Sequence, residues 1–486
     1  MKYKFLGGGA LLLSAAMVLS GCGGSTVSAD TDTLAESGIQ VVSAVPAAVS
    51  ADTAGVETAF AEAFSSRDLA GTYDAASAVR IALNGTSISC DSSAVTVSGT
   101  TVTITAAGTY LFSGTLDNGT VIVDAGKEDK VQLVLEGVSI HSDTFAAIYV
   151  RQADKVFVTL AEGTVNTLSN GGTFTAIDDY NVDGVIFSKD DLTLNGSGKL
   201  VISASGKHGV VCKDDLVITD GTYEITASSH ALSGKDSVSI AGGTFTLTAG
   251  KDGIHSENTE DAQKGSVYLA DGTFTITAGS DGVSASGILQ VDGGTYTITA
   301  SEGMEGTYLR VNGGTVQIYA TDDGMNAARK VSGYTPTIEI NGGDLKVEVG
   351  PGDTDGIDSN GNLIITGGTI DVTGNSAFDC DGTVTFTGGT VIVNGQQVDT
   401  IPTQMGGRGG MGGMGRNFNG GGMPEDGTLP GSRSGRTPDG TIDGTPDGMM
   451  PNGRGGKGQK PGKNFQQRPD AVTNPTENAG ENMGTI

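Results

Sequence analysis

Acidic residues and histidines recur at one place in a glycine-rich repeat, and these side chains could hold a metal ion. Each residue of this column precedes a glycine or an alanine and follows shortly after a Gly-Thr strand pattern. The column consists of Asp183, His208, His230, Asp252, Asp281, Glu302, Asp323 and Asp355. Further acids flank it, namely Glu257, Glu305, Asp322, Asp353, Asp358, Asp379 and Asp381.

Carboxylates in such a column would repel one another if consecutive repeats stack. Stacked strands lie ~4.8 Å apart, and two unit charges at ~5 Å repel by ~3 kcal/mol at an effective dielectric constant of ~20. Cations between the carboxylates would remove this repulsion, and oxygen donors of this kind suit Ca²⁺. We therefore predict calcium ligands among Asp252, Glu257, Asp281, Glu302, Glu305, Asp322, Asp323, Asp353, Asp355 and Asp358.

Two other interpretations of the column stay open. Asp-Gly is a common turn pair, because glycine tolerates positive φ and aspartate caps its own backbone, so each pair could be purely structural. Three histidines, His208, His230 and His255, lie in or near the column. A zinc site would need their imidazoles to converge with a third ligand, and stacked turns alone do not guarantee that convergence.

The repeat that carries the column predicts an all-β fold. Its clearest unit, Gly-Thr-aromatic-Thr-Ile-Thr-Ala, recurs with small changes at 221–227, 243–249, 272–278 and 294–300. Apolar residues alternate with threonines and charged residues in each copy, as in a strand with one buried face. A coil of about 20–22 residues with occasional loop insertions explains the spacing of the copies. Three short strands in such a coil favour a parallel β-helix, whereas a propeller needs about 40 residues per blade.

The rest of the chain divides around this repeat array. Residues 1–21 have the basic start and apolar run of a signal peptide, and Leu19-Ser20-Gly21-Cys22 resembles a bacterial lipobox. We expect lipidation of Cys22, which would anchor the secreted chain to the outer face of the bacterial cytoplasmic membrane. Residues 22–79 are expected to form a spacer, 80–403 the β-helix, and 404–486 a disordered tail rich in Gly, Met and Pro.

The formal net charge of −28 limits the partners of the chain. A surface this acidic argues against direct binding of nucleic acid or anionic lipid, so we expect membrane contact through the lipid anchor alone. The cysteines beyond Cys22 are Cys90, Cys212 and Cys380, and they are far apart in the sequence. They show no metal-binding spacing, and we expect each to be a small buried residue without a disulfide partner.

Several segments together resemble a bacterial carbohydrate-binding β-helix family that binds pectin and cellulose. These segments are 135–140, 146–150, 153–164, 322–328 and 355–361. The resemblance covers about residues 80–400. It implies a right-handed parallel β-helix like that of pectate lyases, with bound calcium and affinity for an acidic plant-type polysaccharide such as polygalacturonate.

Three functions are compatible with these observations. The first is a non-catalytic binder, in which calcium bridges protein carboxylates and the uronate groups of the glycan. The second is a polysaccharide lyase, which needs a cation and a base for β-elimination; Arg329 and Lys330, just past the column, are the best candidates for the base. The third is a structural stalk or adhesin. We predict the first, without enzymatic activity.

Overall fold

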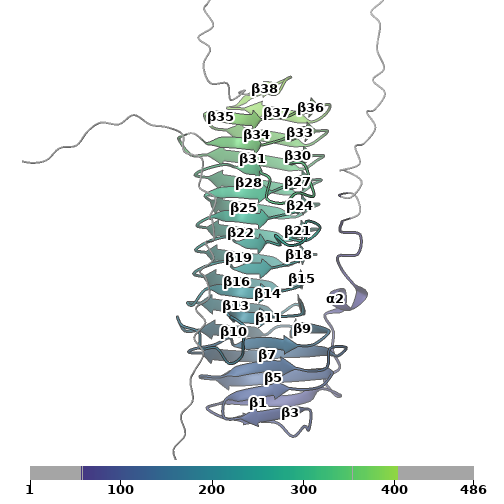
Figure 1. The fold of residues 1–486 in the computed structure, drawn as a ribbon, viewed down its shortest axis with the longest axis vertical. Coiled ribbons are helices and arrows are strands. Elements are labelled where there is room, and N and C mark those ends of the chain that lie inside the picture. Colours follow the sequence, from purple (N-terminus) through teal and green to yellow (C-terminus); the bar gives the residue numbers. More distant parts are fainter. Residues whose placement is uncertain (1–55, 57–58, 353, 403–486) are drawn as a thin grey trace, which may run out of the picture. The chain divides into compact units, whose positions relative to one another are not determined.

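The computed structural model describes residues 56, 59–352 and 354–402. The expected signal peptide, the lipidation site Cys22 and the tail at 404–486 lie outside this part of the chain. No helix within it is long and apolar enough to cross a membrane. The described chain winds into an all-β solenoid of stacked parallel strands, shown upright in Figure 1. The all-β prediction is therefore confirmed.

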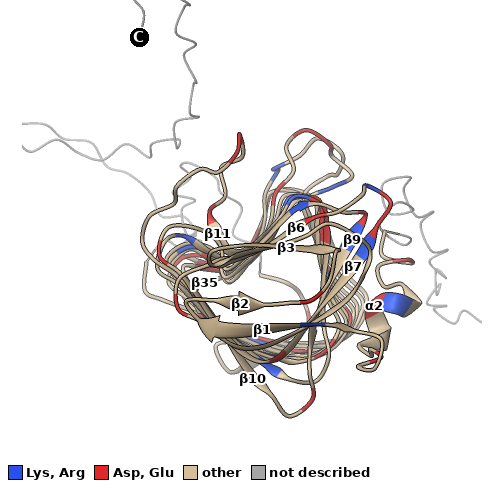
Figure 2. Ribbon diagram, turned by 90° about the horizontal axis from the view of Figure 1, so that it is seen from below, with Lys and Arg blue, Asp and Glu red and all other residues tan. Residues whose placement is uncertain are grey.

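Three stacks of strands run along the solenoid, and successive coils superpose when seen along its axis (Figure 2). The first stack belongs to a 13-stranded sheet and carries the acidic column. Its strands are β3 (Val95–Ser98), β4 (Thr101–Ile104), β6 (Thr120–Asp124), β8 (Ile148–Gln152), β11 (Gly184–Ser188), β14 (His208–Cys212), β17 (Leu232–Gly234), β20 (Ile254–Ser256), β23 (Asp281–Ala285), β26 (Glu302–Gly306), β29 (Met325–Ala327), β32 (Asp355–Ser359) and β35 (Ser376–Cys380).

The other two stacks belong to one 25-stranded sheet and meet at its long strand β7, which pairs with both β9 and β10. The second stack starts at β9 (Lys155–Leu160) and continues with β12 (Asp191–Asn195), β15 (Asp215–Ile218), β18 (Ser237–Ile240), β21 (Ser266–Leu269), β24 (Ile288–Val291), β27 (Tyr308–Val311), β30 (Thr337–Ile340), β33 (Asn362–Ile365) and β36 (Val384–Phe386).

The third stack carries the repeat unit that is clearest in the sequence. It contains β10 (Val165–Asn170), β13 (Lys199–Ala204), β16 (Thr222–Ala227), β19 (Thr244–Ala249), β22 (Thr273–Ala278), β25 (Thr295–Ala300), β28 (Thr315–Ala320), β31 (Asp344–Val349), β34 (Thr369–Thr373) and β37 (Thr390–Val393). The remaining strands are β1 (Val79–Gly85), β2 (Ile88–Ser89), β5 (Gly108–Leu116), β7 (Lys130–Ser142) and β38 (Gln396–Val398).

Aromatic residues of the repeat stack inside the solenoid. Tyr223, Phe245, Phe274 and Tyr296 are consecutive register partners on β16, β19, β22 and β25, and all four are buried. Their ring centroids are 5.0, 4.6 and 4.7 Å apart in turn. The threonines between the apolar residues of these strands face solvent. The alternation in the sequence therefore identified the inward face correctly.

The glycine at the start of each repeat unit is required by the turn. Gly243 has φ +114°, a conformation that favours glycine. A Cβ at this position would lie 3.0 Å from the carbonyl oxygen of Gly221, one coil earlier. The coils can therefore stack closely at this corner only where the turn lacks a side chain.

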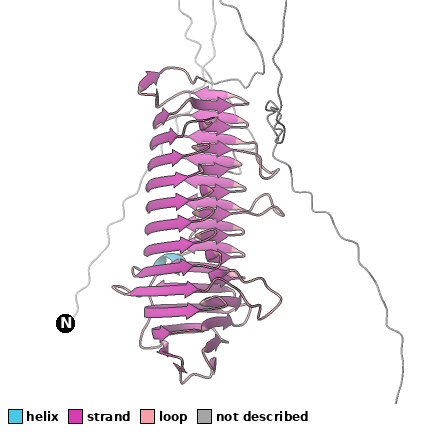
Figure 3. Ribbon diagram, turned by 90° about the vertical axis from the view of Figure 1, so that its left-hand side faces the viewer, coloured by secondary structure: helices cyan, strands magenta, loops and turns pink. Residues whose placement is uncertain are grey.

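In the described part of the chain, antiparallel pairs occur near the two ends of the solenoid. They join β1 to β2, β3 to β4 and β37 to β38. Figure 3 shows the strands between these ends stacked in one direction. Because an open edge of a parallel sheet can pair with another chain, these hairpins reduce that risk.

Residues 59–79, which we assigned to a spacer, lie against the outside of the solenoid. The short helix α2 (Ser66–Ala70) has Ser65 as its N-cap. Its Asp68 is buried, with a carboxylate oxygen 2.8 Å from Nζ of Lys155 on β9. Nδ2 of Asn195 on β12 donates a 3.1 Å hydrogen bond to the Asp68 carbonyl. This segment is therefore part of the folded domain.

Candidate functional site

A first ladder of polar side chains runs along the 13-stranded sheet, one residue per coil. It contains the register-aligned residues His208, His230, Asp252, Asp281, Glu302, Asp323 and Asp355. Asp183 is displaced from this register by one residue, because Gly184 is the partner of His208. Apart from Asp183, the column predicted from the sequence is thus a continuous ladder.

A second ladder lies three residues further along each coil, on the same sheet. It contains Ser233, His255, Ser284, Glu305, Asn326, Asp358 and Asp379. Toward the N-terminus the same row continues with Ile122, Tyr149, Phe187 and Val211, which are buried in a separate apolar cluster. The polar part of the row therefore begins only at Ser233. Ser233, Ser284 and Asn326 were not predicted from the sequence, because they carry no charge.

Backbone N–H groups of the next coil hold the side chains of the first ladder in place. The amide of Asp281 donates to Oδ1 of Asp252 at 3.2 Å, and the amide of Asp355 donates to Oδ1 of Asp323 at 3.0 Å. In the same way, the amide of His230 donates to Nδ1 of His208 at 3.3 Å. Part of the ladder therefore has a structural role between coils, which differs from the local turn capping that the Asp-Gly pairs suggested, and the two carboxylates each keep a second oxygen for other contacts.

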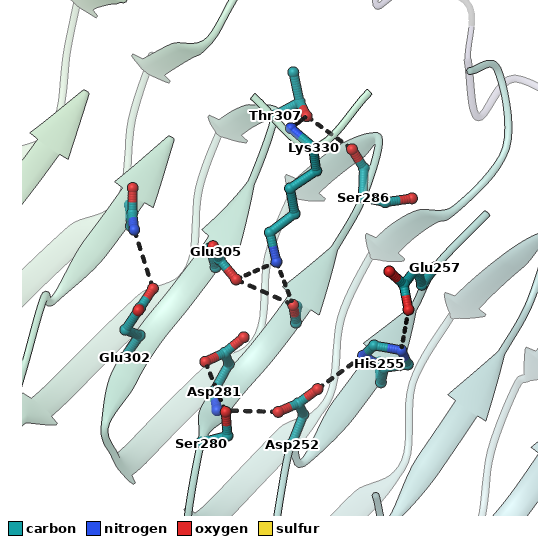
Figure 4. Close-up of polar contacts among 12 residues, drawn as sticks. Asp252, His255, Glu257, Ser280, Asp281, Ser286, Glu302, Glu305, Thr307 and Lys330 are labelled. Atoms are coloured by element: carbon teal, nitrogen blue, oxygen red, sulfur yellow. Dashed lines mark hydrogen bonds and ion pairs between the residues drawn. The ribbon is translucent and has the colours of Figure 1, made fainter. Parts of the chain in front are cut away.

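Carboxylates of the two ladders converge between β23 and β26. Oxygens of Asp281, Glu302 and Glu305 lie within 4.8 Å of one another. Lys330 reaches this acidic cluster from a loop: its Nζ contacts Glu305 and lies 3.1 Å from Oγ of Ser284 (Figure 4). Burial raises the pKa of Glu305 to about 7, and Lys330 opposes that shift only in part. Burial also raises the pKa of Glu302.

A second group of acids lies nearer the C-terminal end of the ladders. Burial, together with repulsion from Asp323, Asp355, Asp379 and Asp381, raises the pKa of Asp358 to about 7. Burial likewise raises the pKa of Asp323 to about 6. These carboxylates are therefore poorly neutralised by the protein itself.

Asn326 stands between the two acidic groups. It is 9% exposed, and its Nδ2 donates a 3.0 Å hydrogen bond to Oε2 of Glu302. Its Oδ1 is buried and has no hydrogen-bond partner within the described structure. A buried acceptor surrounded by carboxylates fits a cation better than it fits another protein group.

The structure places the other predicted ligands and bases outside the acidic cluster or leaves them undescribed. Glu257 is exposed, and its Oε2 lies 3.8 Å from Nε2 of His255. Asp322 is half-buried beside the first ladder, and Arg329 is exposed. Asp353 lies outside the described residues. Of the two candidate bases, the structure therefore brings only Lys330 into contact with the ladders.

The structure also brings histidines together in a way that the sequence left open. Asp252 Oδ2 lies 3.1 Å from Nδ1 of His230 and 2.7 Å from Nδ1 of His255. Ring nitrogens of both histidines and a carboxylate oxygen of Asp252 lie within 4.8 Å of one another. This histidine cluster lines a pocket of about 330 Å³ that also contains Asp281 and Lys330.

A further acidic group, absent from the sequence predictions, lies at the start of β12 and β15, and two of its members line a groove of about 1120 Å³ beside residues 59–68. It consists of Asp191, Asp214 and Asp215. Burial and a hydrogen bond with Asp236 raise the pKa of Asp214 to about 7. These acids occur at a different turn from the column, so the repeat alignment did not single them out.

Comparison with known proteins identifies the family. The model of a family of carbohydrate-binding domain-containing proteins matches residues 98–354 and 301–400, more than half of the chain. The chain belongs to this family. A carbohydrate-binding domain-containing protein of Acetivibrio thermocellus is 35% identical over 258 residues, which cover 53% of this chain and 73% of that protein. A solved polysaccharide lyase-like protein from C. thermocellum, a gadolinium derivative, is 28% identical, with a TM-score of 0.41 over 64% of this chain and 99% of that one.

Membership of the carbohydrate-binding family supports polysaccharide binding as the function of this chain. The matched residues 98–400 include both ladders, the acidic cluster and the histidine cluster. The acidic cluster and Asn326 therefore lie within the residues that the family model matches.

Proposed function

We propose that this chain is a calcium-dependent binder of acidic polysaccharide of the polygalacturonate type, without catalytic activity. It would act at the cell surface, anchored through lipidated Cys22, on a right-handed parallel β-helix with about 20–22 residues in its basic coil. The family supports the carbohydrate part of this proposal. The remaining parts rest on the sequence and on the arrangement of the two ladders.

One observation carries the calcium proposal: among the described residues, buried Oδ1 of Asn326 lacks a hydrogen-bond partner, and it lies between two groups of carboxylates. Glu302, Glu305 and Asp358 offer oxygens from neighbouring coils, and Asn326 adds an amide oxygen. Ca²⁺ accepts six to eight ligands of these types and tolerates irregular geometry. When bound, the ion would supply positive charge in a site that otherwise has too little.

Calcium would also explain how an acidic protein binds an acidic polymer. The chain has a net charge of −28, so a polyuronate would be repelled from its surface. A cation that keeps coordination positions open toward solvent can bind a uronate carboxylate while it remains bound to the protein. Exposed threonines along the strands, such as Thr246 and Thr275, are additional donors for sugar hydroxyls.

The test is co-sedimentation of the chain from residue 23 onward with insoluble polygalacturonate, in calcium and in excess chelator. Absorbance of unsaturated uronate products is followed on the same samples. We expect pull-down with calcium only and a flat absorbance trace. Equal pull-down with chelator would refute the calcium dependence, and no pull-down under either condition would favour a structural stalk.

A lyase is the second candidate, and one contact favours it. Nζ of Lys330 lies beside Glu305 and Ser284, within the cluster that would hold the cation. β-Elimination needs a cation to acidify the proton on the sugar ring and a base to remove that proton. Lys330 could act as this base only after its ammonium group, which pairs with Glu305, had lost a proton. A rising absorbance trace that disappears in a Lys330→Gln variant would establish this function instead.

A further inference from the structure

The histidine cluster has a donor set that differs from that of the acidic cluster. Asp252 follows His230 by one coil in the first ladder, and His255 lies three residues after Asp252 in the second ladder. Two imidazoles and one carboxylate therefore meet at one point. The side chains of His230, Asp252 and His255 are only 12%, 7% and 20% exposed.

Acceptor atoms crowd one another in this cluster. Nδ1 of His230 accepts a 3.3 Å hydrogen bond from the amide of Asp252, so this nitrogen presents a lone pair. The acceptor Oδ2 of Asp252 nevertheless lies 3.1 Å from it. Nδ1 of His255 lies 2.7 Å from the same oxygen, but outside hydrogen-bond geometry. A proton on an imidazole nitrogen or a bound metal ion would make these contacts favourable.

A third imidazole lies beside the cluster. The His208 ring stacks on the His230 ring with centroids 5.0 Å apart.

The histidine cluster opens onto the pocket of about 330 Å³, which Glu257 also lines. Glu257 is exposed, with Oε2 3.8 Å from Nε2 of His255. The pocket therefore offers a further carboxylate beside the three converging donors.

We propose that His230, Asp252 and His255 form a binding site for a divalent transition-metal ion of the zinc type, separate from the calcium site. Imidazole nitrogens favour zinc and its neighbours in the periodic table, whereas Ca²⁺ takes oxygen ligands. Three protein ligands leave a coordination position for water or a glycan oxygen in the pocket. The His230 and His255 rings are stacked at 4.2 Å and 16°, so one imidazole turns when the ion binds.

The experiment is a titration of the chain from residue 23 onward with Zn²⁺ alone, in buffer with millimolar Ca²⁺ and without glycan. We expect one tightly bound Zn²⁺ per chain, and an affinity more than about tenfold weaker in His230→Gln and His255→Gln. His141→Gln is the matched control, because His141 lies on β7 and contacts Ser169 and Asp143 instead. An affinity that is unchanged in both cluster variants, or equally reduced in the control, overturns the proposal.

A measurement on the unmodified chain covers the case in which a variant fails to fold. Co²⁺ bound by imidazole and carboxylate in a four-coordinate site gives visible absorption, which Zn²⁺ should then abolish one for one. Absence of that absorption at saturating Co²⁺ contradicts the site. Neither titration contains polysaccharide. A failure to bind Zn²⁺ or Co²⁺ is therefore independent of whether the chain binds polygalacturonate.

Discussion

Asp281 on β23 is the register partner of Glu302 on β26, which sets two carboxylates one coil apart on the same face of the sheet. Among the described residues, Lys330 places its ammonium group against Glu305. The acidic cluster is therefore under-neutralised in the chain by itself. Its expected behaviour toward pH, calcium and substitution follows from this imbalance.

Without metal, the chain should become less stable as the pH rises from about 6.5 to about 8.5. The pKa values of Glu305, Asp358 and Asp214 are raised to about 7, so the folded state keeps protons that the unfolded state has lost. The buried His208 has the opposite effect, but only below its ordinary pKa, so it does not alter the sign in this range. Thermal unfolding in chelator at the two pH values measures the effect. Saturating calcium should reduce it, and a stability that rises with pH would contradict the prediction.

Asn326→Ala should weaken calcium binding by about tenfold, or ~1.4 kcal/mol, because it removes the amide oxygen assigned to the ion. The variant also loses the 3.0 Å hydrogen bond from Nδ2 to Oε2 of Glu302, so stability in chelator should fall by about 1 kcal/mol. Calorimetric titration with Ca²⁺ measures the affinity. Asn312→Ala is the matched control, because Asn312 is at another turn, where its Nδ2 bonds to Asp292. Equal losses in the two variants would remove Asn326 from the site.

Lys330→Gln should increase calcium affinity a few-fold, because it removes a positive charge that competes with the ion at Glu305. Polygalacturonate pull-down should persist and product absorbance should stay flat. Arg329→Gln, at the exposed neighbouring residue, should leave calcium affinity unchanged. Weaker calcium binding in Lys330→Gln would show that Lys330 helps to build the site rather than competing with the ion.

Phe274→Ala should lower the free energy of unfolding by about 3–5 kcal/mol, because it leaves a cavity between two stacked rings. Phe274 is fully buried, with ring centroids 4.6 Å from Phe245 and 4.7 Å from Tyr296. Thr275→Ala on the exposed face of the same strand should change it by less than about 0.5 kcal/mol. Denaturant unfolding distinguishes the two, and similar effects would mean that this strand is not packed as described.

Asp68→Ala should release residues 59–79 from the solenoid, because it leaves Lys155 without its buried partner. Limited digestion with trypsin is the measurement, since Arg67 lies next to the substituted residue in α2. We expect faster cleavage after Arg67 than in the unmodified chain. Asp74→Ala is the control, because the Asp74 carboxylate accepts a hydrogen bond from the nearby amide of Ala76 and interacts with neighbouring Ser77. If cleavage is equally slow in both variants, the segment is held by its apolar contacts.

Much of the fold and part of the site followed from local pattern. Alternation of Phe245 and Leu247 with threonines identifies the buried face of a strand, because side chains of a strand point to opposite sides in turn. Repetition of that pattern, with a glycine that needs positive φ at each turn, predicts stacked coils. Since stacked coils put equivalent residues in register, the first ladder from His208 to Asp355 was also predictable.

The sequence by itself determined the strand faces, the repeat and the acidic column, because these depend on near neighbours in the chain. Only the tertiary structure decided that Lys330 reaches Glu305, that Asp252 meets both His230 and His255, and that Asp68 is buried against Lys155. Apart from Asp252 and His255, which lie three residues apart in one coil, the residues joined by these contacts lie on different coils, loops or segments. Their distances depend on how loops of unequal length fold back onto a rigid stack, and no local periodicity encodes that path.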